Sequence, residues 1–138
     1  MDHQDLEYLH HNHLVLPLAN PLSSDLDVMR TTLMPGLLNS LSRNLRRQQS
    51  RVRLYEAGVA FLQGEVMNEV ERIAAVASGD VLPEQWGVSG REMDFYDIKG
   101  NVEQLFSMKG VDGSPSFEAG ALAWMHPGAS AIVKVDGK

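Results

Sequence analysis

The chain has 138 residues, 43% hydrophobic residues and a formal net charge of −6, which predict one globular domain. With no cysteine, the chain cannot form disulfides, thiolate nucleophiles or cysteine-ligated zinc and iron–sulfur sites. Its longest apolar runs fall far short of the roughly 20 residues that span a bilayer, and no charged start precedes an apolar run as in a secretory signal. We therefore expect a cytoplasmic protein without a membrane-spanning segment.

The first 13 residues are predicted to form a polar, loosely ordered segment. They hold four of the five histidines, namely His3, His10, His11 and His13. Two histidines three residues apart on a helix can bind a metal, but terminal segments are usually poorly ordered, and we favour a solvated segment. A short or edge strand is predicted over residues 14–18, because Pro17 interrupts that apolar run.

An amphipathic helix is predicted over residues 32–49 from leucines that recur every four residues. Thr31 or Thr32 is expected to cap its start, and Pro35 falls in the first turn, where its missing N–H costs least. Its apolar stripe consists of Leu33, Met34, Leu37, Leu38, Leu41 and Leu45. This stripe either covers the sheet of its own domain or contacts a second subunit, and both uses are compatible.

The polar side of this helix and the residues after it are rich in arginine, with Arg43, Arg46, Arg47, Arg51 and Arg53. Such a group can contact phosphates. Cations near a helix C-terminus also complement its dipole, and the aromatic side chains that stack on bases are missing nearby. We favour a solvated face and keep Arg43, Arg46 and Arg47 as candidate RNA contacts.

Four further strands are predicted from apolar patterning over residues 52–62, 72–77, 116–124 and 131–135. A second helix is predicted to start at Asp94, which forms a capping-box variant with Asp97. Its buried face is expected to comprise Phe95, Ile98, Val102, Leu105 and Phe106. Gly100 within this helix indicates either the close approach of another backbone or chance. This element order predicts an α+β fold with an antiparallel sheet flanked by helices.

Candidate catalytic residues are few. Asp94, Asp97 and Lys99 resemble an acid/base cluster, but carboxylates at a helix N-terminus are favoured electrostatically, and we prefer that structural interpretation. His126 precedes Pro-Gly, which favours a turn over a general base. Phosphate-binding glycine loops, the Gly-x-Ser-x-Gly elbow and His-Glu-x-x-His are all absent. Spacing alone therefore predicts no enzyme.

Three ordered segments carry a resemblance to a known family. The first segment has three parts. They are Asn20-Pro21-Leu22-Ser23-Ser24, the residues from Met29 to Leu38, and Arg53-Leu54-Tyr55-Glu56-Ala57-Gly58. The others run from Asp94 to Glu103 and from His126 to Ala131. Together they resemble the beta subunit of bacterial phenylalanine–tRNA ligase over about residues 15–135.

The resemblance implies a partial class II aminoacyl-tRNA synthetase-like module over residues 14–138, truncated at its C-terminus, where Asp136-Gly137 signals a hairpin. The long helix and the 52–62 strand are similar to the class II unit that builds subunit interfaces. In the family such helices pack at the centre of an (αβ)2 tetramer with the alpha subunit. The six residues of the apolar stripe are then interface candidates.

The resemblance also implies that this chain is non-catalytic. The Arg-x-Glu of class II active sites, whose arginine binds the ATP α-phosphate, occurs nowhere, and neither does Gly-x-Gly-x-Gly. We therefore expect no catalytic, cofactor-binding or metal-binding residue here. The family places the phenylalanine and ATP sites on the alpha subunit, and the holoenzyme that charges tRNA(Phe) uses ATP and magnesium. The alternatives are a free-standing RNA- or ligand-binding domain of the same fold and, less favoured, a small hydrolase that uses Asp94, Asp97 and His126.

Overall fold

The computed structural model describes residues 16–23, 27–62, 68–108, 113–120, 124–126 and 128–136. The predicted N-terminal segment with its histidines lies outside these residues. The chain divides into two compact units, Met1–Gly79 and Asp80–Lys138, and each is described by itself. Neither the length nor the periodicity predicts this division.

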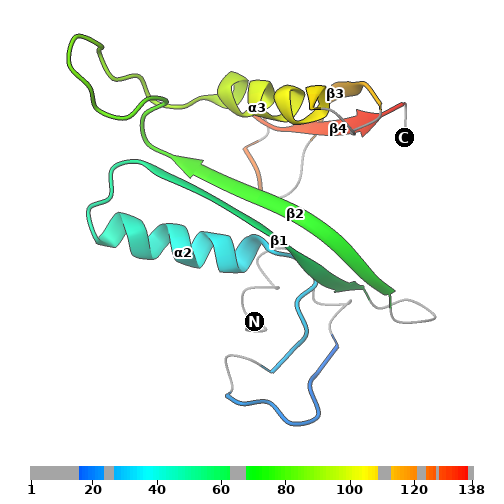
Figure 1. Cartoon of the computed structure of the whole chain (residues 1–138). Helices are drawn as coiled ribbons and strands as arrows, with labels where there is room; N and C mark the ends of the chain where they lie inside the picture. Colours follow the sequence, from blue (N-terminus) through cyan, green and yellow to red (C-terminus); the bar gives the residue numbers. More distant parts are fainter. Residues whose placement is uncertain are drawn as a thin grey trace. The chain divides into compact units, whose positions relative to one another are not determined.

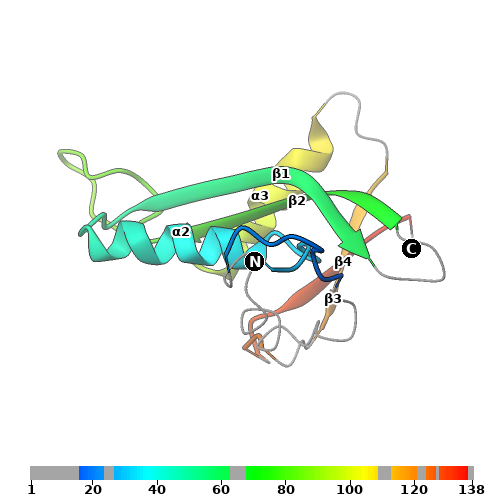
Figure 2. The same cartoon turned by 90° about the horizontal axis from the view of Figure 1, so that it is seen from below.

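The first unit is a long antiparallel hairpin covered by one helix. Strands β1 (Val52–Leu62) and β2 (Asn68–Ser78) pair along their whole length, with Leu54 opposite Val76. Helix α2 (Met34–Arg46) runs along this hairpin and packs on both strands (Figures 1 and 2). The bounds predicted for β1 are confirmed. Strand β2 extends beyond the predicted residues 72–77 to Ser78 at one end and over residues 68–71 at the other, where three of the four residues are polar.

The core of this unit lies between α2 and the hairpin. Its fully buried apolar residues are Val28, Leu33, Leu37, Val52 and Ala60. The segment before the helix is held by a bridge between Pro17 and Val28, so part of the predicted 14–18 strand pairs, as an isolated bridge. Burial of one leucine stripe against the sheet drives this packing.

Both ends of α2 follow from local chemistry. Pro35 sits in the first turn as predicted, and Thr32 Oγ1 accepts a hydrogen bond from the Met34 N–H at 3.3 Å. The N-cap position itself is Leu33, without a side-chain cap. The helix ends three residues before the predicted 49, because Gln48 adopts a left-handed φ of 61° and reverses the chain.

A single arginine ties the segment before α2 to β1. Arg30 donates from Nε to the Val59 carbonyl at 2.7 Å and from Nη1 to Glu56 Oε1 at 2.5 Å. The Arg30 carbonyl accepts from the Phe61 N–H at 2.8 Å. The guanidinium lies over Gly58, where an added Cβ would be 3.3 Å from Arg30 Cζ and closer still to Nη2. A side chain at this position would therefore require the Arg30 guanidinium to move.

The second unit contains α3 (Phe95–Ser107) and a separate hairpin, in which β3 (Pro115–Ala119) pairs antiparallel with β4 (Ala131–Val135). The capping box is confirmed: Asp94 Oδ1 accepts from the N–H groups of Tyr96 and Asp97, and Asp97 Oδ2 accepts from the Asp94 N–H. The bounds of β4 are confirmed, whereas β3 ends before the predicted 124, with residues 121–123 outside the described part.

The α+β class and the antiparallel pairing are confirmed, but the described strands form two two-stranded sheets rather than one. The predicted buried face of α3 is wrong, since no residue of α3 is buried and Phe95, Ile98 and Leu105 are exposed. The described hairpin of this unit has strands of only five residues each, which offer too little surface to cover such a face. A Cβ atom added at Gly100 would lie within 4 Å of no other described segment. Gly100 therefore does not mark the close approach of another backbone.

Arg91 reinforces the start of α3. Its guanidinium donates from Nη1 to Asp97 Oδ2 at 2.9 Å and from Nη2 to Asp97 Oδ1 at 2.7 Å. These hydrogen bonds, together with the one from the Asp94 N–H, stabilise the ionised carboxylate and lower the pKa of Asp97 to about 2. The same contact raises the pKa of Arg91. The carboxylate thus contributes to folding mainly when it is ionised.

We expect Gly58→Ala to lower the free energy of unfolding by about 1–2 kcal/mol, because the new methyl group would push the Arg30 guanidinium off Glu56 and Val59. Urea titration followed by circular dichroism measures this change. Gly36→Ala is the matched control. Its Cβ would meet Glu56 Oε2 at 3.5 Å, an ordinary contact, and Ala is the better helix former, so this variant should be as stable as the wild type or more so. Equal losses in the two variants would contradict the assigned role of Gly58.

We expect the stability of α3 to fall as the pH is lowered from about 4 towards 2. A carboxylate whose pKa is lower in the folded state stabilises above its unfolded pKa, and this stability is lost as the pH falls through the folded value. Thermal melts followed at 222 nm across this pH range measure the effect. Asp97→Asn should flatten the acid-induced decrease, while Glu103→Gln, which leaves the cap intact, should retain it. An unchanged pH profile in Asp97→Asn would refute the assignment.

Candidate functional site

The apolar stripe of α2 is divided between two environments. Leu33 and Leu37 are 3% and 4% exposed and belong to the core, whereas Leu38 and Leu45 remain 42% and 45% exposed. Met34 and Leu41 are half-buried between these pairs. Part of the stripe therefore covers the hairpin of its own unit, which is one of the two uses predicted for it. The rest forms an exposed apolar edge, and the interface prediction now depends on this edge.

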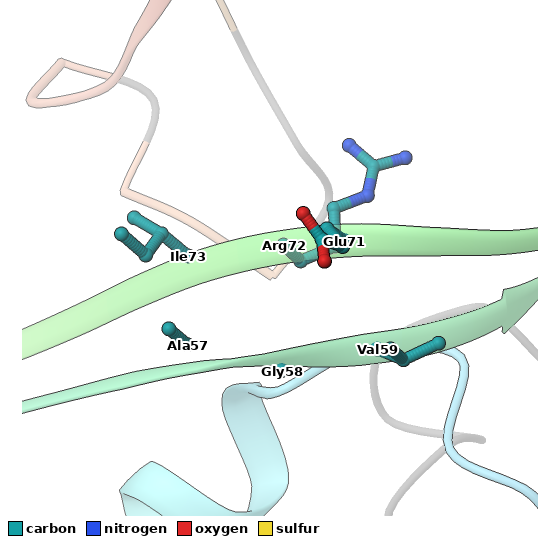
Figure 3. Close-up of a pocket in the computed structure, with 6 residues that line it drawn as sticks. All are labelled: Ala57, Gly58, Val59, Glu71, Arg72 and Ile73. Atoms are coloured by element: carbon teal, nitrogen blue, oxygen red, sulfur yellow. The ribbon is translucent and has the colours of Figure 1, made fainter.

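The face of the hairpin that carries the odd-numbered residues of β1 exposes apolar side chains beside the charged Arg53, Glu69 and Glu71. Tyr55 and Ile73, which lie on this face, are 80% and 67% exposed. Next to Tyr55 on this face, Ala57 pairs with Ile73, and Val59 pairs with Glu71 two residues further along. The small side chains at Ala57 and Gly58 leave a shallow hollow of about 430 Å³ in the hairpin, which Figure 3 shows.

The hollow offers little for catalysis. Its charged residues, Glu71 and Arg72, are consecutive on β2 and therefore project from opposite faces of the strand. Within the described residues, no group of three or more histidine, aspartate or glutamate side chains lies close enough to hold a metal ion. The surface is instead suited to contact with another apolar surface. The sequence signal for it is that β1 carries apolar residues on both of its faces, from which no site was predicted.

The arginine group lies at the C-terminal end of α2. Arg43 and Arg46 are in the last helical turn, Arg47 is the C-cap residue, and all three are exposed. Arg53 points back onto the hairpin, where Nη1 donates to the carbonyls of Val52 and Ser78 at 2.8 and 2.7 Å. The structure thus separates the structural Arg53 from the three arginines that were predicted as RNA contacts.

The residues that resembled an acid/base cluster have structural roles. Asp94 and Asp97 form the cap of α3 with Arg91. Lys99 Nζ lies 3.5 Å from Glu103 Oε1 and 5.0 Å from the centre of the Phe117 ring. His126 Nδ1 accepts from the Gly128 N–H at 3.1 Å, so the predicted turn role is confirmed.

A second hollow, of about 350 Å³, lies in the Asp80–Lys138 unit, where Phe95, Tyr96 and Phe117 supply an aromatic wall beside Lys99. His126 and Asp97 do not line it. The three side chains of the least favoured hydrolase hypothesis are therefore not gathered around this hollow.

The described helices include none that is long and apolar enough to cross a membrane.

Comparison with known proteins gives one consistent result. A family model described as the phenylalanyl tRNA synthetase beta chain CLM domain matches residues 1–138, the whole chain. Among curated proteins, the phenylalanine–tRNA ligase beta subunit of Psychrobacter arcticus is 48% identical over 124 residues. That of Thiobacillus denitrificans is 45% identical over 123 residues, and that of Pseudomonas putida 43% identical over 125.

These matches cover 88–89% of this chain but only 15–16% of each relative. The chain therefore spans about a sixth of the length of the curated relatives that it matches. The resemblance carried by the residues from Asn20 to Gly58, from Asp94 to Glu103 and from His126 to Ala131 is confirmed. With a match to the family model over its full length and relatives above 40% identity, the chain belongs to the family of phenylalanine–tRNA ligase beta subunits.

Proposed function

We propose that this chain is a non-catalytic structural module of a phenylalanine–tRNA ligase beta subunit, which supports assembly with the alpha subunit. The observation that carries the proposal is the exposed edge of α2, where Leu38 and Leu45 extend a stripe whose other members are buried. Exposed leucines that continue a core stripe are typical of a surface that another polypeptide covers.

The catalytic step is proposed to take place elsewhere in the enzyme. Arg-x-Glu is absent from the sequence, and the candidate carboxylates Asp94 and Asp97 are engaged in a helix cap. The described residues do not fit an ATP–magnesium site, since they offer neither a positioned arginine for the α-phosphate nor a cluster of carboxylates for the metal. We therefore assign the phenylalanine and ATP sites to the alpha subunit, and place the ATP and magnesium that the holoenzyme uses outside this chain.

In this proposal the holoenzyme is a cytoplasmic (αβ)2 tetramer that joins phenylalanine to tRNA(Phe), and this chain is part of a class II synthetase-like core. Membership of the beta-subunit family supports the assignment to this enzyme. The α+β class and the antiparallel hairpins are compatible with such a core. The exposed face of β1 and β2, with Tyr55 and Ile73, supplies additional apolar surface for contact with other parts of the assembly.

We expect Leu38→Asp combined with Leu45→Asp to weaken association with the alpha subunit by about 30-fold or more, because two desolvated contacts worth 1 kcal/mol or more each would be lost. The chain is co-expressed with the alpha subunit of the same organism, and the co-purified alpha subunit is quantified. The buried Leu37 is unsuitable for this test, since Leu37→Asp would disrupt the core.

Leu22→Asp is the matched control, because Leu22 is 95% exposed in the same unit and lies outside α2. This variant should co-purify with the alpha subunit as the wild type does. Circular dichroism verifies that all variants are folded. Undiminished recovery of the alpha subunit with the folded double variant would rule out the interface role of α2.

A further inference from the structure

The three arginines at the end of α2 have no acidic partner among the described residues, in contrast to four other cations of the chain. Arg30 pairs with Glu56, Arg91 with Asp94 and Asp97, Lys99 with Glu103, and Lys134 with Glu118. Among the described residues no ion pair involves Arg43, Arg46 or Arg47, although all three are exposed. Their charge is therefore available to an external anion.

The surrounding sequence concentrates this positive charge. No aspartate or glutamate occurs between Asp27 and Glu56, while that stretch holds six arginines. The chain as a whole carries a net charge of −6. A positive region on an acidic chain attracts a polyanion at one place and repels it from the rest, which favours a defined orientation of binding.

The helix dipole does not account for all three residues. The field of the dipole falls off within the last turn, and Arg47 lies beyond it as the C-cap residue. Three of the last carbonyls are satisfied by the backbone: Arg43 O accepts from the Arg47 N–H, Asn44 O accepts from the N–H groups of Arg47 and Gln49, and Leu45 O accepts from that of Gln48. These three carbonyls therefore need no guanidinium donor.

We propose that Arg43, Arg46 and Arg47 form a binding site for the phosphodiester backbone of RNA, which in the holoenzyme is the bound tRNA. This inference rests on the proposed function, because the enzyme brings tRNA to this chain. Guanidinium groups bind phosphate oxygens through paired hydrogen bonds. No aromatic residue occurs from Val28 to Leu54, so the contact is made to phosphates rather than by base stacking, and it has no sequence preference.

The test measures the anisotropy of fluorescently labelled tRNA(Phe) titrated with the whole chain at 50 and 200 mM salt. Three phosphate contacts predict an affinity loss of roughly 20- to 40-fold between these concentrations, from the release of counterions. Arg43→Ala with Arg46→Ala and Arg47→Ala should abolish most of this salt dependence. The corresponding triple lysine variant, which keeps the charge, should retain it at weaker affinity.

Arg72→Ala is the matched control, because Arg72 is an exposed cation of the same unit that lies on β2. It should bind tRNA as the wild type does. An equal loss with Arg72→Ala, or unchanged salt dependence in the triple alanine variant, would overturn the proposal. It would also be overturned if vesicles of phosphatidylcholine and phosphatidylserine bound the chain through these arginines and tRNA did not.

The two proposals fail separately. The triple alanine variant should still co-purify with the alpha subunit, since it leaves Leu38 and Leu45 in place. Leu38→Asp with Leu45→Asp should still bind tRNA with the salt dependence of the wild type. Loss of tRNA binding in the leucine variant alone would assign the RNA contact to the apolar edge and overturn the arginine site.

Discussion

The contact of Arg30 with β1 is the interaction on which the Met1–Gly79 unit depends. One guanidinium joins Glu56 and Val59 across Gly58, and the Arg30 carbonyl receives the Phe61 N–H. The segment before α2 is thereby held along the strand, so the helix begins with Leu33 and Leu37 directed into the core. The leucine edge and the arginine group lie on the helix that follows this anchored segment.

A second constraint is the small size of each sheet. Two strands bury one face under a single helix and leave the other face open. In the Met1–Gly79 unit the result is an exposed surface with Tyr55 and Ile73, and in the Asp80–Lys138 unit α3 has no buried residue. So much uncovered apolar area fits a module whose family relatives are more than six times as long as the part of them matched here.

The predictability of the site differed between residues for physical reasons. The cap at Asp94 and Asp97 was predicted because it depends on neighbours three residues apart, and so was the turn at His126. By contrast, the sequence did not predict that the leucine stripe is divided, with Leu37 buried and Leu38 exposed. Helical periodicity identifies which side of a helix is apolar. How much of that side a sheet buries depends on how far the sheet extends beneath the helix.

The sequence by itself determined the family, the α+β class, the ends of β1 and β4 and the capping box of α3, because these follow from local patterns of residues or from segments in a recognisable order. Only the tertiary structure decided that the described strands form two separate sheets and that the Arg30 guanidinium lies over Gly58. It also decided that Arg53 bonds to the hairpin while Arg43, Arg46 and Arg47 remain exposed. Each of these depends on groups distant in sequence meeting in space, which no local pattern encodes.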